Sequence, residues 1–585
     1  MSSSKHPSLR RASLHAAYVS GTIALTSILL LRFHFIYGYP VGDSTQYNVP
    51  WSVAFSQQFW SGDWYPRWLF AFPANIGGPV FYFYGPLPFY ALAFISALAP
   101  GLSPTETLTV FHGLLYGFSG LAFYVWARRH ASSGASLLGA CLYMGAPYHF
   151  IDIEHRNAIG EAMAFILVPL IFRYLLDVEM QGRRWLRASL LYAALIISHL
   201  PSALLTTPFM ILSTAIVYRD APVRGLIRLG VTGCCGLLLA GIYLAPALAL
   251  RDWLPSDAWL TDANSWPETW LLPGGFFFRA GGLFFGAILS LVALAGCLQL
   301  GLWMAHRHRK REDRARPVVV AAWVGLAVSI VMFSEASVWL WTHVGPLRNV
   351  QFPFRLGVIT DFLSVTIIVC ALQRLLEMAH RAVSAVWVGA TVAVVFMATT
   401  GLMSVPDFAA VYLGRLPQVD EKPLECCVQA SEYWMGSVLH SPLFASLKTR
   451  KAYQAAVGAF PALDPRRALT QDEALEGRQV AGRLVIEARL SAPAEVRIGQ
   501  AYLPEWRLAA NGSAEAVPLR SDPDTGLTLA ELPAGSHQFA LFIPETEAEW
   551  WGKWASVAGL LLTFAAALMF REEPITATSE ARAGS

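Results

Sequence analysis

The amino-acid sequence predicts an α-helical polytopic membrane protein of about twelve transmembrane helices, with one extracytoplasmic β-sandwich domain near its C-terminus. Composition is the first reason: 55% of the 585 residues are hydrophobic and only 14% are charged, whereas soluble domains carry about 25% charged residues. The second is a series of apolar runs separated by loops that are alternately basic. The third is a stretch of alternating apolar and polar residues after residue 478, a pattern typical of strands.

Twelve apolar runs are long enough to cross a bilayer, although several are close to the lower limit for a span. They lie at residues 14–37, 108–127, 134–150, 159–178, 187–200, 203–218, 229–249, 283–305, 317–335, 356–373, 384–403 and 554–570. The net charge is only +3, so the composition gives no reason to expect a nucleic acid as a partner.

Arginine and lysine gather in every second loop between these runs. Arg128 and Arg129 follow the second run, Arg183 and Arg184 follow the fourth, and the basic block 306–316 follows the eighth. Because cytoplasmic loops carry the excess of positive charge, both chain termini are predicted to be cytoplasmic. The predicted organisation is a transmembrane domain with outer-face loops (1–403), an extracytoplasmic domain (404–553), a last transmembrane helix (554–570) and a cytoplasmic tail (571–585).

One apolar run, residues 84–100, is left out of the predicted spans. Counting it would place Arg128 and Arg129 outside and would invert every later loop. The run is proline-rich at its start and is bounded by Pro100. We therefore expect a helix that lies on the outer surface or dips into it.

The first outer loop, residues 38–107, supplies one candidate catalytic residue. Asp43 follows the first span directly, and a carboxylate at the mouth of a helix bundle is costly to desolvate. A turn aspartate exposed to water is the simpler alternative, and position alone favours it. From Pro50 an interfacial amphipathic helix is expected, with Trp51, Ala54, Phe55 and Phe59 on one face and Gln57, Gln58 and Asp63 on the other.

The second outer loop, residues 150–158, concentrates ionisable side chains at a membrane surface. The group comprises His149, Asp152, Glu154, His155 and Arg156, with Glu161 shortly after. On a helix, His149, Asp152 and Arg156 would share a face. Histidines with carboxylates could orient an acceptor or hold a divalent cation such as Mg or Mn, and an arginine could hold a phosphate. The spacing matches no strict metal motif, and a salt-bridged helix end is an equally good interpretation.

The outer loops also carry candidate residues for binding a lipid phosphate or a sugar. Arg348 and Arg355 lie on the predicted outer side, against the charge rule, and outer arginines at a helix entry suit a lipid phosphate. Snorkelling of these side chains is the alternative. Trp64 and Trp253 could stack on sugar rings, but an interfacial aromatic belt is the better explanation for most tryptophans of the loop 250–282.

Short strands and turns are expected in the extracytoplasmic domain from about residue 478. The turns fall at Asn511-Gly512, Asp524-Thr525-Gly526 and Pro533-Ala534-Gly535, and together with the alternating segments they predict a small β-sandwich. Residues 405–477 have a mixed composition that indicates no particular fold.

Several of these segments resemble GT-C-fold glycosyltransferases, which are membrane enzymes that use polyprenyl-phosphate sugars. In the first outer loop the resemblance rests on Gly42-Asp43, residues 61–68 (SGDWYPRW), Gly78-Pro79 and residues 83–87 (FYGPL). The closest similarity is to bacterial membrane proteins described as 6-pyruvoyl-tetrahydropterin synthase-related, a name that implies no pterin chemistry. Residues 148–161, Ser198-His199, 351–355 and 502–506 are similar too, with Glu505 where a glycine is usual.

The resemblance implies an inverting glycosyltransferase of the bacterial inner (cytoplasmic) membrane with a polyprenyl-phosphate sugar as donor. An acidic residue early in the first outer loop is the base of such enzymes, and Asp43 matches it. The other candidates then divide into acceptor or cation ligands (His149, Asp152, Glu154, His155, Glu161) and carrier-phosphate ligands (Arg156, Arg348, Arg355).

Two other classes of function are compatible with the same sequence. About twelve helices with both ends inside is also typical of a transporter or lipid flippase, but no internal repeat is visible and the polar clusters lie at the outer surface rather than mid-membrane. A non-catalytic envelope assembly protein that binds glycans through its β-domain would tolerate any residue in place of Asp43.

Overall fold

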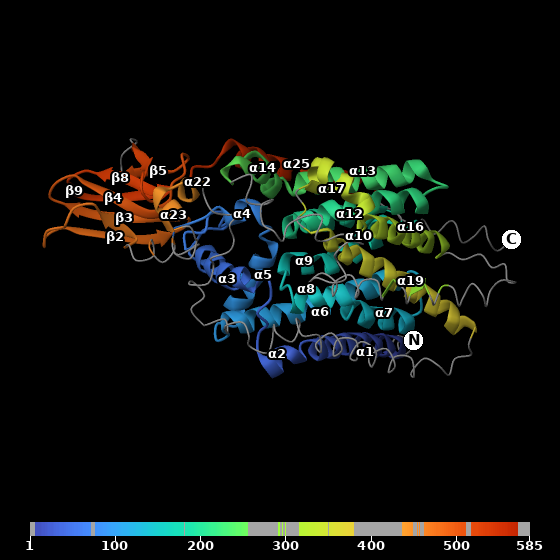
Figure 1. Ribbon diagram of the computed structural model, residues 1–585. Helices are drawn as coiled ribbons and strands as arrows, with labels where there is room; N and C mark the ends of the chain where they lie inside the picture. Colours follow the sequence, from blue (N-terminus) through green and yellow to red (C-terminus); the bar gives the residue numbers. More distant parts are fainter. Residues whose placement is uncertain are drawn as a thin grey trace.

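Helices make up most of the molecule, and the strands are gathered at one end of it (Figure 1). The computed structural model describes residues 6–71, 76–180, 182–254, 315–348, 352–378, 436–447, 461–510 and 516–570, with a few single positions between these ranges. Two predicted spans, 283–305 and 384–403, fall mostly or wholly outside the described residues, as does the predicted boundary at residue 404.

Six helices in the described ranges are long and apolar enough to cross a membrane. They are α1 (His6–Leu30), α6 (Pro104–Ala127), α12 (Leu200–Val217), α13 (Pro222–Leu239), α19 (Gly357–Met378) and α25 (Glu547–Met569). Three shorter apolar helices accompany them: α5 (Leu87–Leu98), α7 (Ser133–Met144) and α16 (Arg316–Met332). The chain is therefore a membrane protein with several apolar helices, whereas the count of about twelve spans stays a prediction.

Three predicted spans in the middle of the chain form shorter or interrupted helices. The runs 134–150, 159–178 and 187–200 correspond to α7, α8 (Pro147–Glu154), α9 (Ile159–Ala162), α10 (Ala164–Leu175) and α11 (Arg187–Ser198). The break before α8 follows from Pro147, because a proline forces the preceding residue, here Ala146 at ψ 139°, out of the helical region. A second break at Asn157, which has φ 54°, leaves residues 155–158 as a loop between α8 and α9.

The first outer loop folds back over the helices. The predicted amphipathic helix exists as α3 (Thr45–Trp60), which begins five residues before Pro50, and the apolar face containing Trp51 and Phe55 is buried as expected. The expectation that Gln58 lies on the solvent face is wrong: its amide is buried and donates to Asp63 Oδ2 (2.8 Å) and to the Trp68 carbonyl (2.7 Å).

The apolar run 84–100 forms a single short helix, α5, which packs against α3. Twelve residues make a helix of about 18 Å, well short of the ~30 Å hydrocarbon core of a bilayer. The helix is thus too short to count as a span, and its place at the outer membrane surface stays a prediction.

The remaining helical elements of the described ranges are short. They are α2 (Arg32–Tyr37), α4 (Val80–Phe83), η1 (Gly182–Leu186), α14 (Gly241–Ala249), η2 (Arg251–Trp253), η4 (Glu335–Ser337), α17 (Val338–His343), α18 (Gly345–Arg348), η5 (Pro353–Leu356), α22 (Gly436–Leu439) and α23 (Pro442–Leu447).

The C-terminal region contains two antiparallel sheets. One has the strand order β1 (Leu463–Pro465), β4 (Ala494–Ala501), β8 (Leu527–Leu532), β7 (Leu519–Ser521); the other has the order β2 (Ala474–Val480), β3 (Arg483–Leu490), β9 (Gly535–Phe542), β5 (Arg507–Ala510), β6 (Ala516–Val517). Buried side chains from both sheets, such as Ile498 and Phe539, belong to one core. The β-sheet region is thereby confirmed, and its description as a sandwich stays a prediction.

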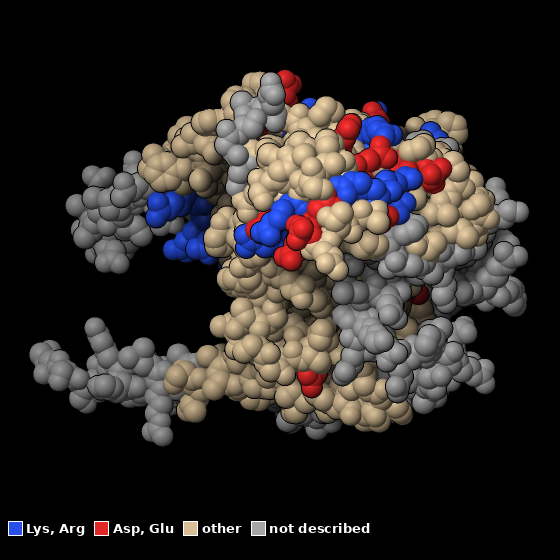
Figure 2. Space-filling model, turned by 90° about the vertical axis from the view of Figure 1, so that its left-hand side faces the viewer, with Lys and Arg blue, Asp and Glu red and all other residues tan. Residues whose placement is uncertain are grey.

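Turn residues explain how the strands of this region reverse. Ala481 and Gly482 both have positive φ, the backbone that a two-residue hairpin between β2 and β3 requires. Gly526 precedes β8 and Gly535 begins β9, also with positive φ, as the predicted turns imply. In Figure 2, basic and acidic residues lie interspersed mainly across the upper part of the face turned toward the viewer, and most of the remaining visible surface is uncharged.

Candidate functional site

A buried group of four charged side chains lies in the break between α8 and α10. Arg156 donates to Asp152 Oδ1 (2.6 Å) and to Glu161 Oε2 (2.7 Å). Arg355 Nε lies 3.5 Å from the same Glu161 oxygen. The group, which we call the ion cluster, thus contains two carboxylates and two guanidiniums, and its formal charges cancel. Such balance is what allows charges to be buried at all.

Three separate segments position the four members of the ion cluster. Asp152 lies in the last turn of α8 and Arg156 lies two residues beyond its end, and their predicted i, i+4 spacing brings the two side chains together. Glu161 comes from α9, and Arg355 comes from η5, immediately before α19. The Tyr148 hydroxyl accepts from Arg156 (3.0 Å) and donates to Glu161 Oε1 (2.6 Å), so it joins the two helices.

The backbone around Asp43 is hydrogen-bonded to the loop that carries the ion cluster. The N–H of Asp43 donates to the His155 carbonyl (3.3 Å), and the N–H of Ser44 donates to the Arg156 carbonyl (2.9 Å). The Asn157 amide donates to Thr45 Oγ1 (2.7 Å), at the first residue of α3. The structure therefore brings Asp43 next to the ion cluster, and the Asp43 residue itself is exposed.

Close packing at Gly42 explains how the two segments approach so closely. A Cβ atom at this position would lie 2.2 Å from the His155 carbonyl oxygen and 2.9 Å from its carbonyl carbon. Neither is the end of a flexible side chain that could rotate away. Glycine is thus the residue that lets the two backbones come within hydrogen-bonding distance.

Burial sets the electrostatics of the ion cluster. It raises the pKa of Asp152 well above its usual range, the neighbouring Glu161 raises that pKa further, and Arg156 and Arg355 oppose both effects. Tyr84, on the first outer loop, belongs to the same surroundings: burial raises the pKa of its hydroxyl to about 12, against the influence of Arg355 and Arg156. A phenol with so high a pKa stays protonated at neutral pH and can donate a hydrogen bond.

Two predicted members of the site face elsewhere. The His149 ring stacks on Phe165 of α10, with centroids 3.8 Å apart, and its Nδ1 lies 3.0 Å from the Tyr143 carbonyl. Glu154 Oε2 lies 3.0 Å from His34 Nε2 of α2, and Tyr116 of α6 donates to Glu154 Oε1 (3.1 Å). Neither His34 nor Tyr116 was predicted to be a partner of Glu154, although His34 is a polar residue within the predicted first span.

The remaining predicted residues lie in different environments. Arg348 is exposed at the end of α18, whereas the Arg355 side chain is only 12% exposed. Trp64 is 71% exposed, with its ring edge-on to Phe59. Trp253 donates from Nε1 to Glu505 Oε1 (3.3 Å), so it contacts the β-sheet region. The other tryptophans of its loop lie outside the described residues.

No group of three or more His, Cys, Asp or Glu side chains that could hold a metal ion occurs among the described residues. His155 is half-buried at the end of α8, one residue before Arg156. In the described ranges, the carboxylates of the ion cluster are bonded to arginines and a tyrosine.

A polar cavity of about 320 Å³ lies between the first outer loop, the β2–β3 turn and the start of α25. Arg67 pairs with Glu549 (2.7 Å) and Lys553 pairs with Glu545 (2.8 Å). The residues of both ion pairs line the cavity, together with Asp63, Tyr65, Trp68, Tyr82, Arg483 and Trp506. Burial raises the pKa of Asp63, although Gln58 hydrogen-bonds to it. Aromatic faces beside paired charges are a combination that suits a neutral polar ligand.

Beside this cavity, hydrogen bonds and an aromatic contact join the first outer loop to the β-sheet region. Trp68 Nε1 donates to Gln500 Oε1 (3.0 Å), and the Gln500 amide donates to the Phe70 carbonyl (3.2 Å). Trp68 and Trp506 pack edge to face, with centroids 5.0 Å apart. The first outer loop therefore connects the β-sheet region to the segment that ends in Tyr84 beside the ion cluster.

The apolar helices and the clusters between them define a polytopic membrane protein. Residues 81–405, more than half of the chain, match the family described as 6-pyruvoyl-tetrahydropterin synthase related domain, a membrane protein family. The chain belongs to this family, as the sequence resemblance predicted. The matched range contains the whole ion cluster and Tyr84, but it begins after Asp43. No curated protein matches the chain.

Proposed function

We propose that the protein is a GT-C-type glycosyltransferase that moves a sugar from a polyprenyl-phosphate carrier to an acceptor hydroxyl at the outer face of a bacterial inner membrane. One observation carries the proposal: an exposed carboxylate, Asp43, is held by its backbone against a buried, charge-balanced ion cluster. A base must be accessible and fixed in place to accept a proton from a substrate, and Asp43 meets both requirements.

The proposed reaction is a single displacement at the anomeric carbon. The acceptor oxygen attacks this carbon while the Asp43 carboxylate takes the hydroxyl proton. The bond between the anomeric carbon and the phosphate oxygen breaks, and the polyprenyl phosphate leaves with the bonding electron pair. Because a phosphate is a good leaving group, no separate acid is required, and attack from the opposite side inverts the anomeric configuration.

Other residues are assigned by their accessibility. Arg348 is exposed and Arg355 is partly accessible at the edge of the ion cluster, so we assign these two to the carrier phosphate. Arg156 already donates to two carboxylates and a phenol. Its proposed role is to position the loop that holds Asp43. The cavity between the first outer loop and the β-sheet region is the proposed place for the acceptor.

Glycan analysis in cells tests the proposal directly. A strain lacking the gene would be complemented with the wild type, with Asp43→Ala or with Asp220→Ala, a matched exposed aspartate after α12. Envelope glycans and glycolipids would be compared by mass spectrometry. We expect a sugar-sized mass difference that the wild type and Asp220→Ala restore and Asp43→Ala does not. Identical profiles for all three inserted proteins would reject the proposal in favour of a flippase or an assembly protein.

A further inference from the structure

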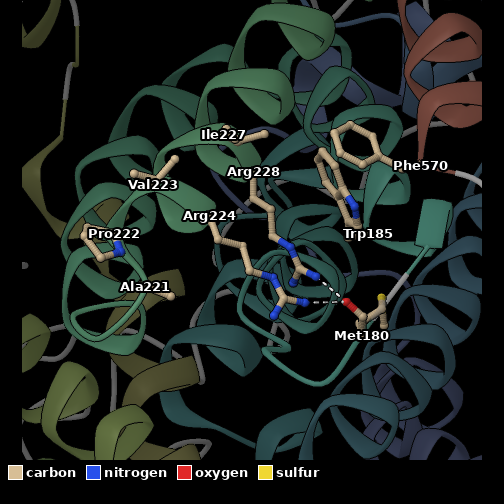
Figure 3. Close-up of a pocket in the computed structure, with 9 residues that line it drawn as sticks. All are labelled: Met180, Trp185, Ala221, Pro222, Val223, Arg224, Ile227, Arg228 and Phe570. Carbon is tan, nitrogen blue, oxygen red and sulfur yellow. Dashed lines mark hydrogen bonds between the residues drawn. The ribbon is translucent and has the colours of Figure 1, made fainter.

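A second cavity, of about 590 Å³, lies at the start of α13, beside η1 and the end of α25 (Figure 3). Its lining is mostly apolar, with two arginines among nine residues: Met180, Trp185, Ala221, Pro222, Val223, Arg224, Ile227, Arg228 and Phe570. Its walls come from segments that follow the fourth and sixth predicted spans and from Phe570, the final residue of the last one, so the charge rule places it at the cytoplasmic side.

Two guanidinium groups converge at one end of this cavity. Arg224 donates to the Met180 carbonyl (3.0 Å), and Arg228 donates to the same oxygen, as Figure 3 shows. Arg228 is buried and is further fixed by the Asp177 carbonyl and the Tyr218 hydroxyl, both at 2.6 Å. Arg224 is exposed. The two cations are therefore held together by neutral oxygen atoms.

Carboxylates do not neutralise this pair within the described ranges. Arg224 and Arg228 form no ion pair there with an aspartate or glutamate. Asp177 is near, because its carbonyl accepts from Arg228, but its carboxylate is taken by Arg129 (2.6 Å) and Arg173 (2.5 Å). The local excess of positive charge favours an anion at the exposed member of the pair, Arg224.

Apolar side chains continue outward from the two arginines. Trp185 and Phe570 pack edge to face side by side on one wall of the cavity, with centroids 5.2 Å apart (Figure 3). Val223 and Ile227, on either side of Arg224 along the helix, are 70% and 44% exposed. A small inorganic anion would leave these side chains in water, whereas an anion with an attached hydrocarbon chain would cover them.

We propose that this cavity binds an anionic glycerophospholipid, whose phosphate is held by Arg224 and whose acyl chain lies against Val223 and Ile227. Arg228 supports the site by fixing the Met180 carbonyl and adding positive potential. The cytoplasmic leaflet is where anionic lipids are abundant and attract basic segments. The proposal does not depend on glycosyl transfer, since the cavity lies on the opposite predicted face from Asp43.

Lipid titrations of the full-length protein in detergent test this site. The probes are dihexanoyl-phosphatidylglycerol, dihexanoyl-phosphatidylcholine and inorganic phosphate, and the readouts are bound lipid by native mass spectrometry and the thermal unfolding midpoint. We expect phosphatidylglycerol to bind and stabilise the wild type more than either other probe. Arg224→Gln should weaken its affinity by about tenfold, the effect of roughly one charged hydrogen bond. Arg219→Gln, a matched exposed arginine, should change nothing.

The two parts of the proposed site can be separated by chain length. Lengthening the acyl chains should increase the affinity of the wild type, and Val223→Ser should reduce that gain while Arg224→Gln preserves it. Equal binding of phosphatidylglycerol and phosphatidylcholine, or unchanged affinity in Arg224→Gln, would overturn the proposal. Inorganic phosphate as effective as the lipid would instead identify a simple anion site.

Discussion

The backbone N–H of Asp43 lies 3.3 Å from the carbonyl oxygen of His155, and the next residue, Ser44, makes the equivalent bond to Arg156 at 2.9 Å. These two bonds connect the residues directly before α3, in the first outer loop, to the loop between α8 and α9. They use only main-chain atoms, so the Asp43 carboxylate keeps its capacity for a substrate. The backbone therefore fixes the position of Asp43, and its carboxylate is not used for this purpose.

Replacing Asp43 should therefore remove activity without loss of stability. In Asp43→Asn the two backbone hydrogen bonds remain, and the exposed amide creates no buried polar group. We expect transfer to fall by about 10²–10⁴-fold, as is usual for loss of a general base. The thermal unfolding midpoint should stay at the wild-type value. A variant that retains transfer would exclude Asp43 as the base, and one that unfolds early would give it a structural role.

Removing Arg156 should lower the stability of the fold, unlike the replacement of Asp43. In Arg156→Met, Asp152 and Glu161 would stay buried without their shared donor. Breaking one partner out of a buried ion pair costs about 3–5 kcal/mol. Arg219→Met, in an exposed pair, should cost less than ~1 kcal/mol. Both would be measured as thermal unfolding midpoints in the same detergent, and equal midpoints would show that the ion cluster contributes little to stability.

Local sequence spacing predicted only part of the ion cluster. The pair Asp152 and Arg156 follows directly from the i, i+4 spacing of a helix, although α8 ends at Glu154 and Arg156 lies two residues beyond it. The pairing of Glu161 with Arg355 connects segments almost two hundred residues apart, and no local period encodes such a contact. His149 lies on the predicted helix, but its ring is used in packing against Phe165. Ionisable residues that are close together in the sequence can thus have different roles, one in packing and another in an ion pair, and these roles depend on partners that are distant in the sequence.

Amphipathic spacing was a better guide to burial than to polar contacts. It identified the buried face of α3, including Phe55 and Phe59, because the helical period is a property of the chain itself. It placed Gln58 in water, where the structure buries it between Asp63 and Trp68. That burial depends on the path of residues 61–68 after α3, and the pattern of apolar residues within the helix does not predict this path.

Acid should destabilise the β-sheet region through Glu473. Arg467 donates two hydrogen bonds to this carboxylate, at 2.6 and 2.7 Å, and these bonds, then those from Ser491, hold the pKa of Glu473 well below its usual range. Because the folded pKa is the lower one, this contribution is complete above the unfolded value of about 4.3. It is lost as the pH falls below that value.

The comparison with Glu473→Gln isolates this effect. The unfolding midpoint of the variant should be lower than that of the wild type at pH 7, and the difference should shrink as the pH drops below about 4. Glu476→Gln, an exposed neighbour on β2, is the matched control. A difference between wild type and Glu473→Gln that is constant from pH 7 to pH 3 would contradict the prediction.

A methyl group at Gly42 should disturb the site through the backbone alone. In Gly42→Ala the new Cβ would overlap the His155 carbonyl, with 2.2 Å between the two atoms, so one of the segments must move. We expect a loss of stability of about 1–3 kcal/mol, typical of overpacking, and a fall in transfer toward the level of Asp43→Asn. Gly101→Ala, where nothing lies within 4 Å, should behave as the wild type.

The stability and the transfer activity of Gly42→Ala together decide whether the close contact between Gly42 and His155 serves catalysis or only packing. If stability and transfer both fall, the contact between residues 42–44 and the α8–α9 loop positions the carboxylate, because the Asp43 side chain itself is unchanged. If stability falls while transfer is retained, the contact is only a packing feature, and Asp43 works without it. Wild-type values for both would mean that the two segments separate easily, which their paired hydrogen bonds to His155 and Arg156 argue against.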